Sequence, residues 1–364
     1  RRCARRHTGF VTMNFAASAG KPSDGSGTPL KAVQIDGQVV MKIVKHCSEH
    51  SPSLVTGQLL GLDIGATLEV TDCFPFPSAP VGPAADEEVD PDAGADYQLE
   101  MMRCLREINA DNNTVGWYQS TYLGSYYTEE LIETFLAYQE NIKRCVCIVY
   151  DPSRSAKQGV FSLKALRLTD KFYDIHKKGE FTFEKIADKS LSWSEIVTET
   201  PVTITNSALA AAVFGELTVE TQRDEQTGLT KGDLDRLDMS AAPFLERSLE
   251  FLSECMDDLA SEQQKVAFYQ RNLARHTLQQ TQWLQKRKTE NASRKAAGQE
   301  PLPEDDESNT KNVTEPSRLE GFLIANQVNQ YVEQIQEFGQ ASLQKLYLVS
   351  GAQGVDNIAP ATPE

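Results

Sequence analysis

Two spacings of apolar residues follow one another near the start of this chain, and each predicts a different element. Helical spacing on one face predicts an amphipathic helix over residues 37–50. Two apolar runs at residues 54–62 and 67–76 then predict a β-hairpin, with Gly65 in its turn. The apolar positions of the helix are Val39, Val40, Ile43, Val44 and Cys47.

Helices and strands continue to alternate through the first half of the chain. The spacing of large apolar residues predicts helices over residues 97–108 and 131–138. Runs of β-branched and aromatic residues predict strands at 114–120, 144–150 and 159–168. This alternation predicts an α/β domain with a central mixed β-sheet flanked by helices.

Residues 1–30 and 78–96 lack apolar periodicity, and we expect both segments to be flexible and solvated. The first is rich in arginine at its start, which suits either a transit segment or a natural start at Met13. The second contains three prolines and six acidic residues. A cation-binding loop is the alternative to a solvated loop there, although the spacing does not match an EF-hand.

Long amphipathic helices are expected in the second half of the chain. After a strand at residues 196–204 and a helix capped near Asn206, apolar residues recur in steps of three or four. Residues 263–294, rich in Gln, Arg and Lys, predict a long helix that projects from the domain. Its basic cluster at residues 286–288 is compatible with RNA contact, but a solvated helix surface is the simpler explanation. The apolar positions that begin this region are Leu245, Leu249, Leu252, Met256 and Leu259.

A last helix is predicted over residues 317–350, after an acidic, Pro-rich segment at residues 298–316. Its apolar side chains are costly to leave in water, since each is worth roughly 1.5–3 kcal/mol when fully buried. They therefore need a partner, either the chain's own long helix or a helical bundle built with other subunits. The predicted interface positions are Leu319, Phe322, Leu323, Val328, Val332, Ile335, Phe338, Leu343 and Leu346, with Leu249, Leu252 and Met256 of the preceding helix.

Composition narrows the class of protein. The chain has 364 residues, 40% of them hydrophobic, and a net charge of -16. No apolar run approaches the roughly 20 residues that span a membrane, and the negative charge opposes a chain that coats nucleic acid along its whole length. The predicted divisions are a tail at 1–30, an α/β core at 31–170, its extension at 171–225, a long helical region at 226–297, the linker at 298–316, the last helix at 317–350 and a tail at 351–364.

Candidate metal ligands and nucleophiles are few. The seven cysteines are scattered and predict reduced thiols in place of a disulfide framework. Cys145 and Cys147 should share one face of a strand as buried thiols, because no second Cys/His pair follows at zinc-finger spacing. His46 and His50 have the spacing of a metal-binding pair, but Cys47 replaces the glutamate of a His-Glu-x-x-His motif, and a solvated helix face explains them. We find no phosphate loop and no nucleophile elbow.

Several motifs, in order along residues 33–168, resemble the MPN family. A strand ends in Gly-Trp-Tyr at residues 116–118 and is followed by a polar triplet, a loop and an amphipathic helix. Tyr-Asp-Pro at residues 150–152 and the run at residues 159–165 come later in the expected order. The resemblance implies an MPN, or JAMM-like, fold. Its catalytic members hold zinc with a His-x-His-Pro motif and a Ser-x-x-Asp motif, and a glutamate on an earlier strand acts as the base.

When the family's motifs are matched to this chain position by position, the zinc ligands are missing. Gln119 and Thr121 stand at the two histidine positions, and Tyr122 stands where proline is expected. Residues 123–132 contain no Ser-x-x-Asp, and residues 56–61 contain no glutamate to serve as the base. Neutral Gln and Thr oxygens are weaker zinc ligands than imidazole nitrogens. We therefore expect an MPN domain without catalysis, metal or cofactor.

A more specific resemblance is to the MPN subunits of eukaryotic translation initiation factor 3, and it covers most of the chain. It implies a cytoplasmic scaffold that pairs through its MPN domain with the MPN-containing subunit f and through its C-terminal helices with further subunits. It also implies contact with the small ribosomal subunit through the complex, an indirect role in mRNA recruitment and no membrane partner. The segments that carry it are residues 33–37, 73–77, 100–103, 116–122, 301–304 and 323–329.

Two other functions are alternatives. Deubiquitinating metalloprotease assemblies also pair an inactive MPN domain with an active one, so the identity of the partners discriminates. RNA binding by the basic helix is opposed by the net charge and by the lack of an aromatic-rich RNA motif. If that helix does bind RNA, charge reversal over residues 286–288 should abolish RNA crosslinking.

Overall fold

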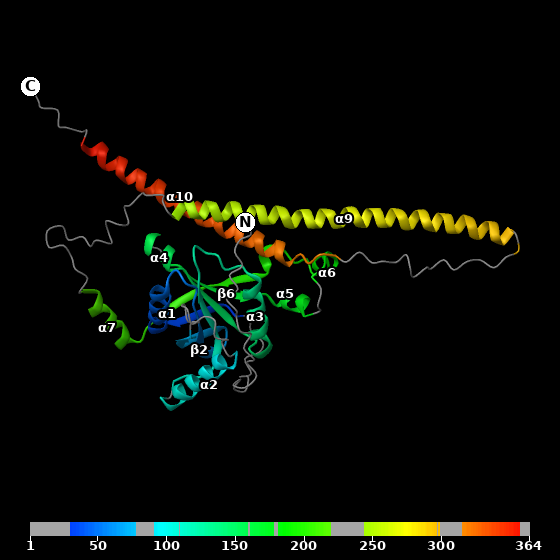
Figure 1. Ribbon diagram of the computed structural model, residues 1–364. Helices are drawn as coiled ribbons and strands as arrows, with labels where there is room; N and C mark the ends of the chain where they lie inside the picture. Colours follow the sequence, from blue (N-terminus) through cyan, green and yellow to red (C-terminus); the bar gives the residue numbers. More distant parts are fainter. Residues whose placement is uncertain are drawn as a thin grey trace, which may run out of the picture.

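The body of the protein is an eight-stranded mixed sheet with helices on both faces (Figure 1). The computed structural model describes residues 30–77, 91–108, 110–158, 161–177, 181–219, 244–296, 298 and 315–356. The strands lie in the order β7-β6-β5-β4-β2-β3-β1-β8. Their bounds are β1 (Ala32–Asp36), β2 (Thr56–Ile64), β3 (Thr67–Pro75), β4 (Thr114–Ser120), β5 (Val146–Tyr150), β6 (Leu163–Leu168), β7 (Val197–Thr200) and β8 (Val202–Thr205).

Parallel and antiparallel neighbours both occur in this sheet, which confirms the predicted mixed sheet. β1 is parallel to β3 and β8, and β4 is parallel to β5. The other neighbours are antiparallel. β2 and β3 form the predicted hairpin, and Gly65 in its turn has a φ of 63°, a conformation that glycine adopts without steric cost.

The two edges of the sheet come from one short stretch of chain, where the sequence predicted a single strand. That prediction is wrong: Pro201 separates β7, which pairs with β6, from β8, which pairs with β1. Proline has no N–H to give to a ladder, and its carbonyl accepts a hydrogen bond from Val33 N at 2.9 Å. Because a single residue joins the two edge strands, the sheet is curled and its two edges come close together at Pro201. The predicted division at residue 170 therefore falls inside one continuous sheet.

Adjacent residues of the central strands point to opposite faces, so each face of the sheet has a large core, and a smaller third cluster forms around Leu60 and Met102. Trp117 belongs to the core beneath α3, whereas Tyr118 belongs to the core beneath α1. Cys145 and Cys147 are fully buried in the same core, which confirms their predicted shared face. The helices are α1 (Gly37–His50), α2 (Pro91–Glu107), α3 (Glu129–Asn141), α4 (Pro152–Gln158), α5 (Asp170–His176), α6 (Phe183–Asp188), α7 (Ala208–Val219), α9 (Phe244–Ala296) and α10 (Leu319–Asp356).

Most predicted boundaries agree with the structure. α1 and β4 coincide with the predicted residues 37–50 and 114–120. α2, however, begins at Pro91, inside the segment predicted as a loop, because proline suits the first turn of a helix. Residues 1–29 and 78–90, predicted to be flexible, lie outside the described residues.

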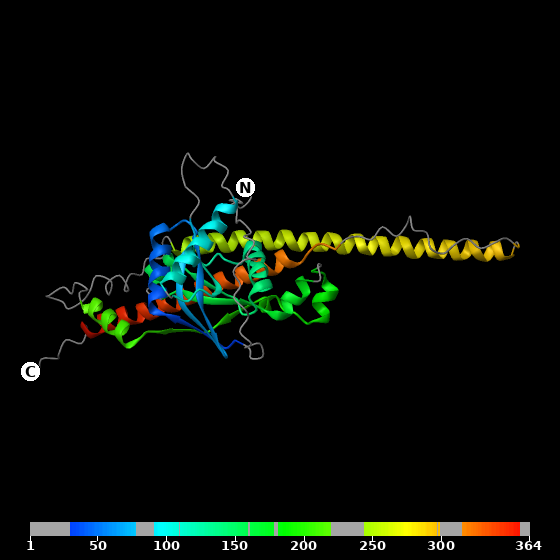
Figure 2. The same ribbon diagram turned by 90° about the horizontal axis from the view of Figure 1, so that it is seen from below.

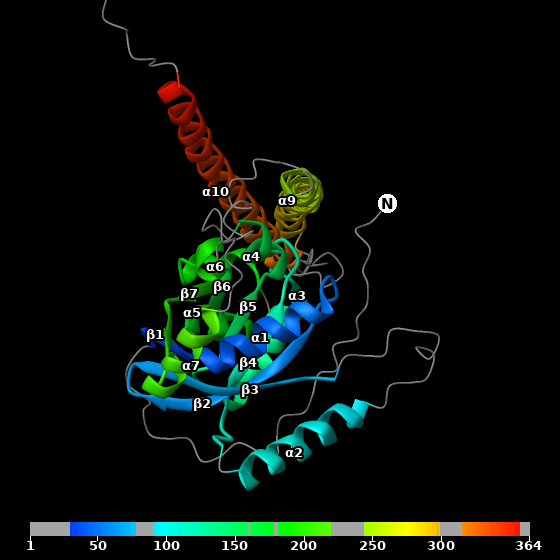
Figure 3. The same ribbon diagram turned by 90° about the vertical axis from the view of Figure 1, so that its left-hand side faces the viewer.

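α7 follows β8 and lies at the α1 end of the domain (Figure 3). The cap predicted near Asn206 is confirmed one residue later, while Asn206 Oδ1 accepts a hydrogen bond from Gly37 N at 3.1 Å. Ser207 takes the capping position, where its Oγ accepts from Ala210 N at 3.2 Å. Asn206 thereby ties the entry of α7 to the first residue of α1.

α9 and α10 cross one side of the domain next to each other (Figures 1 and 2). They run antiparallel, since Phe244 at the start of α9 packs against Phe338, and Lys265, further along it, pairs with Glu320 near the start of α10. The C-terminal part of α9 projects away from the domain (Figure 2). α10 continues to Asp356, past the predicted end at residue 350. Over the described residues, neither these nor the other helices combine the length and apolar content that crossing a membrane requires.

The face that α9 turns toward α10 is not the predicted apolar face. Phe244 and Ser248 are buried, and Phe251 also packs on α10, whereas Leu249 and Met256 are 47% and 56% exposed. The sequence pattern missed Ser248 because it is polar. Its Oγ donates to the carbonyl of Phe244 at 2.9 Å, so burial leaves no polar group unpaired.

Candidate functional site beneath the last helix

The candidate site lies where β4 and β5 end side by side. These strands are parallel, so the residues that follow them meet at one edge of the sheet. Thr121, directly after β4, donates its backbone N–H to the carbonyl of Tyr150 at 2.9 Å. Asp151 comes directly after β5 and precedes α4. Thr121 and Asp151 line one small pocket, and Thr121 is one of the two positions at which the MPN resemblance places a histidine.

Asp151 is a buried carboxyl group at the start of a helix. It is only 1% exposed, and its Oδ1 accepts a hydrogen bond from Arg154 N in the first turn of α4 at 3.0 Å. Burial raises the pKa of Asp151, while hydrogen bonds from nearby backbone N–H groups act in the opposite direction. The side chain therefore has a local structural task, the capping of α4.

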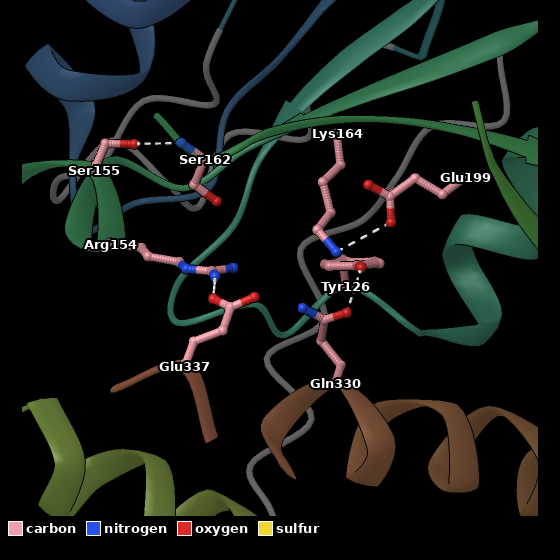
Figure 4. Close-up of polar contacts among 8 residues, drawn as sticks. All are labelled: Tyr126, Arg154, Ser155, Ser162, Lys164, Glu199, Gln330 and Glu337. Carbon is pink, nitrogen blue, oxygen red and sulfur yellow. Dashed lines mark hydrogen bonds and ion pairs between the residues drawn. The ribbon is translucent and has the colours of Figure 1, made fainter. Parts of the chain in front are cut away.

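Three glutamines of α10 meet the loop after β4, and two of them, Gln330 and Gln334, also line the pocket. Gln327 accepts from the backbone N–H groups of Tyr126 and Tyr127 at 3.3 and 3.1 Å, and its Nε2 donates to the carbonyl of Gly124 at 2.9 Å. Gln330 accepts from the Tyr126 hydroxyl at 3.0 Å (Figure 4). These amides pair with polar groups of the loop after β4.

Gln334, the third glutamine, packs against a glycine that has no room for a side chain. A Cβ on Gly124 would lie 1.9 Å from Gln334 Nε2, and Gly124 has a φ of 75°. Gln334 is 1% exposed, and neither atom of its amide has a hydrogen-bond partner among the described residues. The glycine thus lets α10 approach the loop closely, at the cost of a buried amide.

Charged pairs border the glutamines. Arg154, which is buried, forms an ion pair with Glu337 of α10, and Lys164 pairs with Glu199 at 3.1 Å on the other side of Tyr126 (Figure 4). In both pairs the carboxylate is about half exposed while the cation is more buried. The two cations that line the pocket are therefore each paired with a carboxylate.

The two positions predicted for zinc ligands do not converge. Thr121 lines the pocket, and its hydroxyl donates to the carbonyl of Ser125 at 3.0 Å. Gln119 does not line it; its Oε1 accepts a long hydrogen bond of 3.5 Å from Trp117 Nε1. Within the described part of the chain, no three His, Cys, Asp or Glu side chains come together as metal ligands. A divalent metal would find at this pocket one carboxylate, hydroxyls and amides.

The histidine pair of α1 is occupied by internal contacts. His46 Nδ1 and the Tyr118 hydroxyl are 2.9 Å apart, and His50 Nδ1 lies 2.9 Å from the carbonyl of His46. Burial, with the nearby His50, lowers the pKa of His46. His46 therefore belongs to the packing between α1 and the sheet more than to a solvated face.

The predicted interface residues separate into two groups. Leu319 and Leu323 are buried in the chain's own core, and Phe322 packs against it. The remaining positions are wholly or partly accessible: Val328, Val332, Ile335, Phe338, Leu343, Leu346, Leu249, Leu252 and Met256.

Sequence reasoning missed the residues that fill the pocket, namely Asp151, Arg154 and the α10 glutamines. A signal for the glutamines was present. Gln327, Gln330 and Gln334 recur in steps of three and four residues between the apolar positions of the same helix, where solvent-facing residues were expected. Nothing in the sequence indicated which partner they meet.

Two family profiles match this chain in succession. The profile described as "JAB1/Mov34/MPN/PAD-1 ubiquitin protease" matches residues 28–144, and the profile described as "C-terminal region of eIF3h" matches residues 156–357. The MPN fold expected from the motifs is thereby confirmed, with the long helices after it.

Curated relatives agree over nearly the whole length. The H subunit of eukaryotic translation initiation factor 3 from Arabidopsis thaliana is 58% identical over 322 residues, which cover 88% of this chain and 92% of the relative. The H subunit from Dictyostelium discoideum is 42% identical, with 91% and 97% covered. That from Salmo salar is 37% identical, with 96% and 99% covered.

Proposed function

The chain belongs to the family of H subunits of eukaryotic translation initiation factor 3, and from that premise we propose that it is a non-catalytic scaffold subunit of this factor. It pairs with other subunits through its MPN domain and its C-terminal helices. Through the complex it supports recruitment of the small ribosomal subunit and of mRNA in the cytoplasm. Its own contact with mRNA in this role is indirect.

The occupied pocket is the observation that carries this proposal. In the MPN resemblance the zinc ligands follow β4, as two histidines and a Ser-x-x-Asp motif, whereas here Gln119 and Thr121 stand at the histidine positions. Gln327 and Gln330 of α10 hydrogen-bond the loop after β4. A substrate peptide would have to displace α10, and with it buried apolar contacts such as those of Leu323. Both features favour assembly over hydrolysis.

The C-terminal helices offer accessible apolar side chains for assembly. On α9, Leu249 and Met256 are 47% and 56% exposed, and on α10, Leu343 and Leu346 are 54% and 52% exposed. Helices that keep apolar side chains in water gain stability when a partner covers them, as in a multi-subunit helical bundle. One part of α10 therefore packs on its own domain, and another part is left for other subunits.

Pairing with the MPN-containing subunit f has its own candidate surface. α7 is apolar around its circumference, yet Leu209 and Val213 are 78% and 49% exposed. Met41 on the outer face of α1 is 49% exposed, and Asn206 ties α7 to that helix. A helix that is apolar all round is expected to be buried. We assign the surface formed by α1 and α7 to the MPN partner.

Nuclease-treated affinity purification of the tagged chain, with mass spectrometry of its stoichiometric partners, tests the proposal. Recovery of the other subunits of the factor, including f, with the small ribosomal subunit is expected. Recovery of an active MPN protease without those subunits would assign the chain to a deubiquitinating assembly. Zinc content is the second readout: less than about a tenth of a zinc per chain is expected without imidazole ligands, and stoichiometric zinc would contradict a non-catalytic site.

A further inference from the structure

The projecting part of α9 has a charge opposite to that of the rest of the protein. We define the α9 arm as residues 266–296, which begin after Lys265, where α9 makes its ion pair with Glu320 of α10. The arm contains seven basic residues and one acidic residue, Glu290, although the net charge of the chain is -16. It extends for about 46 Å at 1.5 Å per residue. A positive arm on an acidic protein is a local site for a polyanion.

One face of the arm is built for contact with phosphates. Its side chains recur in steps of three and four residues and are all exposed. Within the described residues, no ion pair involves the three cations of this face, whereas Arg287 and Arg294 lie 3.9 Å from Glu290 on another face. The members of this phosphate face are Phe268, Arg271, Arg275, Gln279, Gln282 and Lys286.

The phosphate face points away from the side on which α9 meets α10. The contact side continues into the arm as Tyr269, His276 and Trp283, which are partly buried, while the phosphate face is exposed throughout. Arg287 on the contact side lies 5.2 Å from the ring centroid of Trp283. The exposed cations are therefore available without any change in the packing of the domain.

We propose that the α9 arm binds the phosphate backbone of RNA without regard to sequence. Arginine matches phosphate oxygens with two parallel N–H groups, and glutamine amides also donate to phosphates. An acidic protein partner would need an apolar seam between its charges, but of the six residues on the phosphate face only Phe268 is apolar. The choice of RNA among polyanions rests on the proposed function. That the basic arm binds a polyanion follows from its charge and does not depend on the proposed function.

Binding of the purified full-length chain to a fluorescein-labelled RNA duplex of about 20 base pairs tests the proposal, because affinity for a phosphate backbone falls with salt in proportion to the contacts made. The test variant combines Arg271→Glu, Arg275→Glu and Lys286→Glu. Its control combines Lys31→Glu, Lys45→Glu and Lys143→Glu, which change the net charge equally on exposed positions of the domain. Circular dichroism verifies that all three proteins keep their helices.

The wild type and the control should bind the duplex with a clear salt dependence. The arm variant should bind at least about tenfold more weakly at about 0.1 M salt, since each lost phosphate contact removes close to one logarithmic unit there. In cells, ultraviolet crosslinking should recover RNA with the wild type and the control but not with the arm variant. Equal RNA binding by the arm variant and the control would overturn the proposal, as would tighter binding of the arm to polyglutamate than to RNA.

The experiments distinguish a failure of the RNA-binding proposal from a failure of the proposed function. If the chain is a subunit of the factor but its arm ignores RNA, the wild type co-purifies with the other subunits and does not bind the duplex, which overturns this inference alone. If the α9 arm does bind RNA, the arm variant still co-purifies with those subunits while its RNA binding is lost.

Discussion

The two halves of α10 have similar apolar content but different surroundings. The inner half, residues 319–334, places Leu323 and Tyr331 at 3% and 2% exposure and its glutamines in the pocket after β4. The outer half, residues 335–356, leaves Leu343 and Leu346 more than half exposed. The inner half is therefore part of the domain, whereas the outer half beyond Glu337 and Phe338, which still contact Arg154 and Phe244, is available to a partner.

This difference explains how an MPN domain can become an assembly platform. The inner half covers the pocket with amides that hydrogen-bond the loop after β4, through contacts such as Gln327 with Gly124. Among the described residues, this pocket offers no three convergent metal ligands. The same helix then presents an apolar surface beyond the domain, so in the proposed function one element both borders the pocket and serves docking.

The same substitution in the two halves should have very different effects on stability. Leu323→Ala should lower the free energy of unfolding by about 2–5 kcal/mol, because it creates a cavity in the core. Leu346→Ala, at 52% exposure, should change it by no more than about 0.5 kcal/mol. Urea denaturation of both variants and the wild type gives the comparison. Equal losses would mean that both halves are packed alike in the isolated chain.

Assembly should respond in the opposite order. Leu343→Asp with Leu346→Asp should reduce recovery of the other subunits at least about tenfold, because charges buried in an apolar interface are costly. The melting temperature of the isolated chain should stay the same, since both positions are exposed there. Gln344→Asp is the control, because Gln344 is exposed between the two leucines and a charge there should leave recovery unchanged. Normal recovery with the double variant would place the interface elsewhere.

Removal of one glutamine from the pocket should have a moderate effect. Gln327→Ala leaves the buried N–H groups of Tyr126 and Tyr127 without their acceptor, which should cost about 1–3 kcal/mol of stability. Gln340→Ala, the same change at an exposed position of the outer half, should be neutral within about 0.5 kcal/mol. Denaturant unfolding measures both. A neutral Gln327→Ala would show that the amide contacts do not hold α10 in place.

The smallest expected effect is the pH dependence contributed by Asp151. Burial raises its pKa in the folded protein, so the folded state binds the proton more readily than the unfolded chain, whose value is about 3.9. The stability from this group is full below that value and is lost as the pH rises through the folded pKa. The stability of the wild type relative to Asp151→Asn should therefore increase as the pH falls from 7 toward about 4. A decrease would mean that a cation stabilises the carboxylate.

Local patterns predicted the elements of the domain but not its long-range contacts. The apolar spacing of residues 37–50 and the alternation of residues 114–120 are local signals, and both elements are confirmed. The absence of histidine at residues 119 and 121 was readable in the same way. The glutamines of α10 act on a loop some two hundred residues away, as Gln327 does on Gly124, and no local period encodes such a partner. Pro201 indicates in the sequence that the strand is interrupted there, but no pattern in the sequence indicates that β7 and β8 lie at opposite edges of the sheet.

Hydrogen exchange along α10, measured in the isolated chain and in the assembled initiation factor, tests the central claim most directly. The backbone of the inner half should be protected in both states, because Leu323 and Gln327 pack against the domain. The outer half should exchange rapidly in the isolated chain and become protected in the assembly. An outer half that is equally accessible in both states, or an inner half that loses protection on assembly, would contradict the division of α10 between a closed pocket and a docking surface.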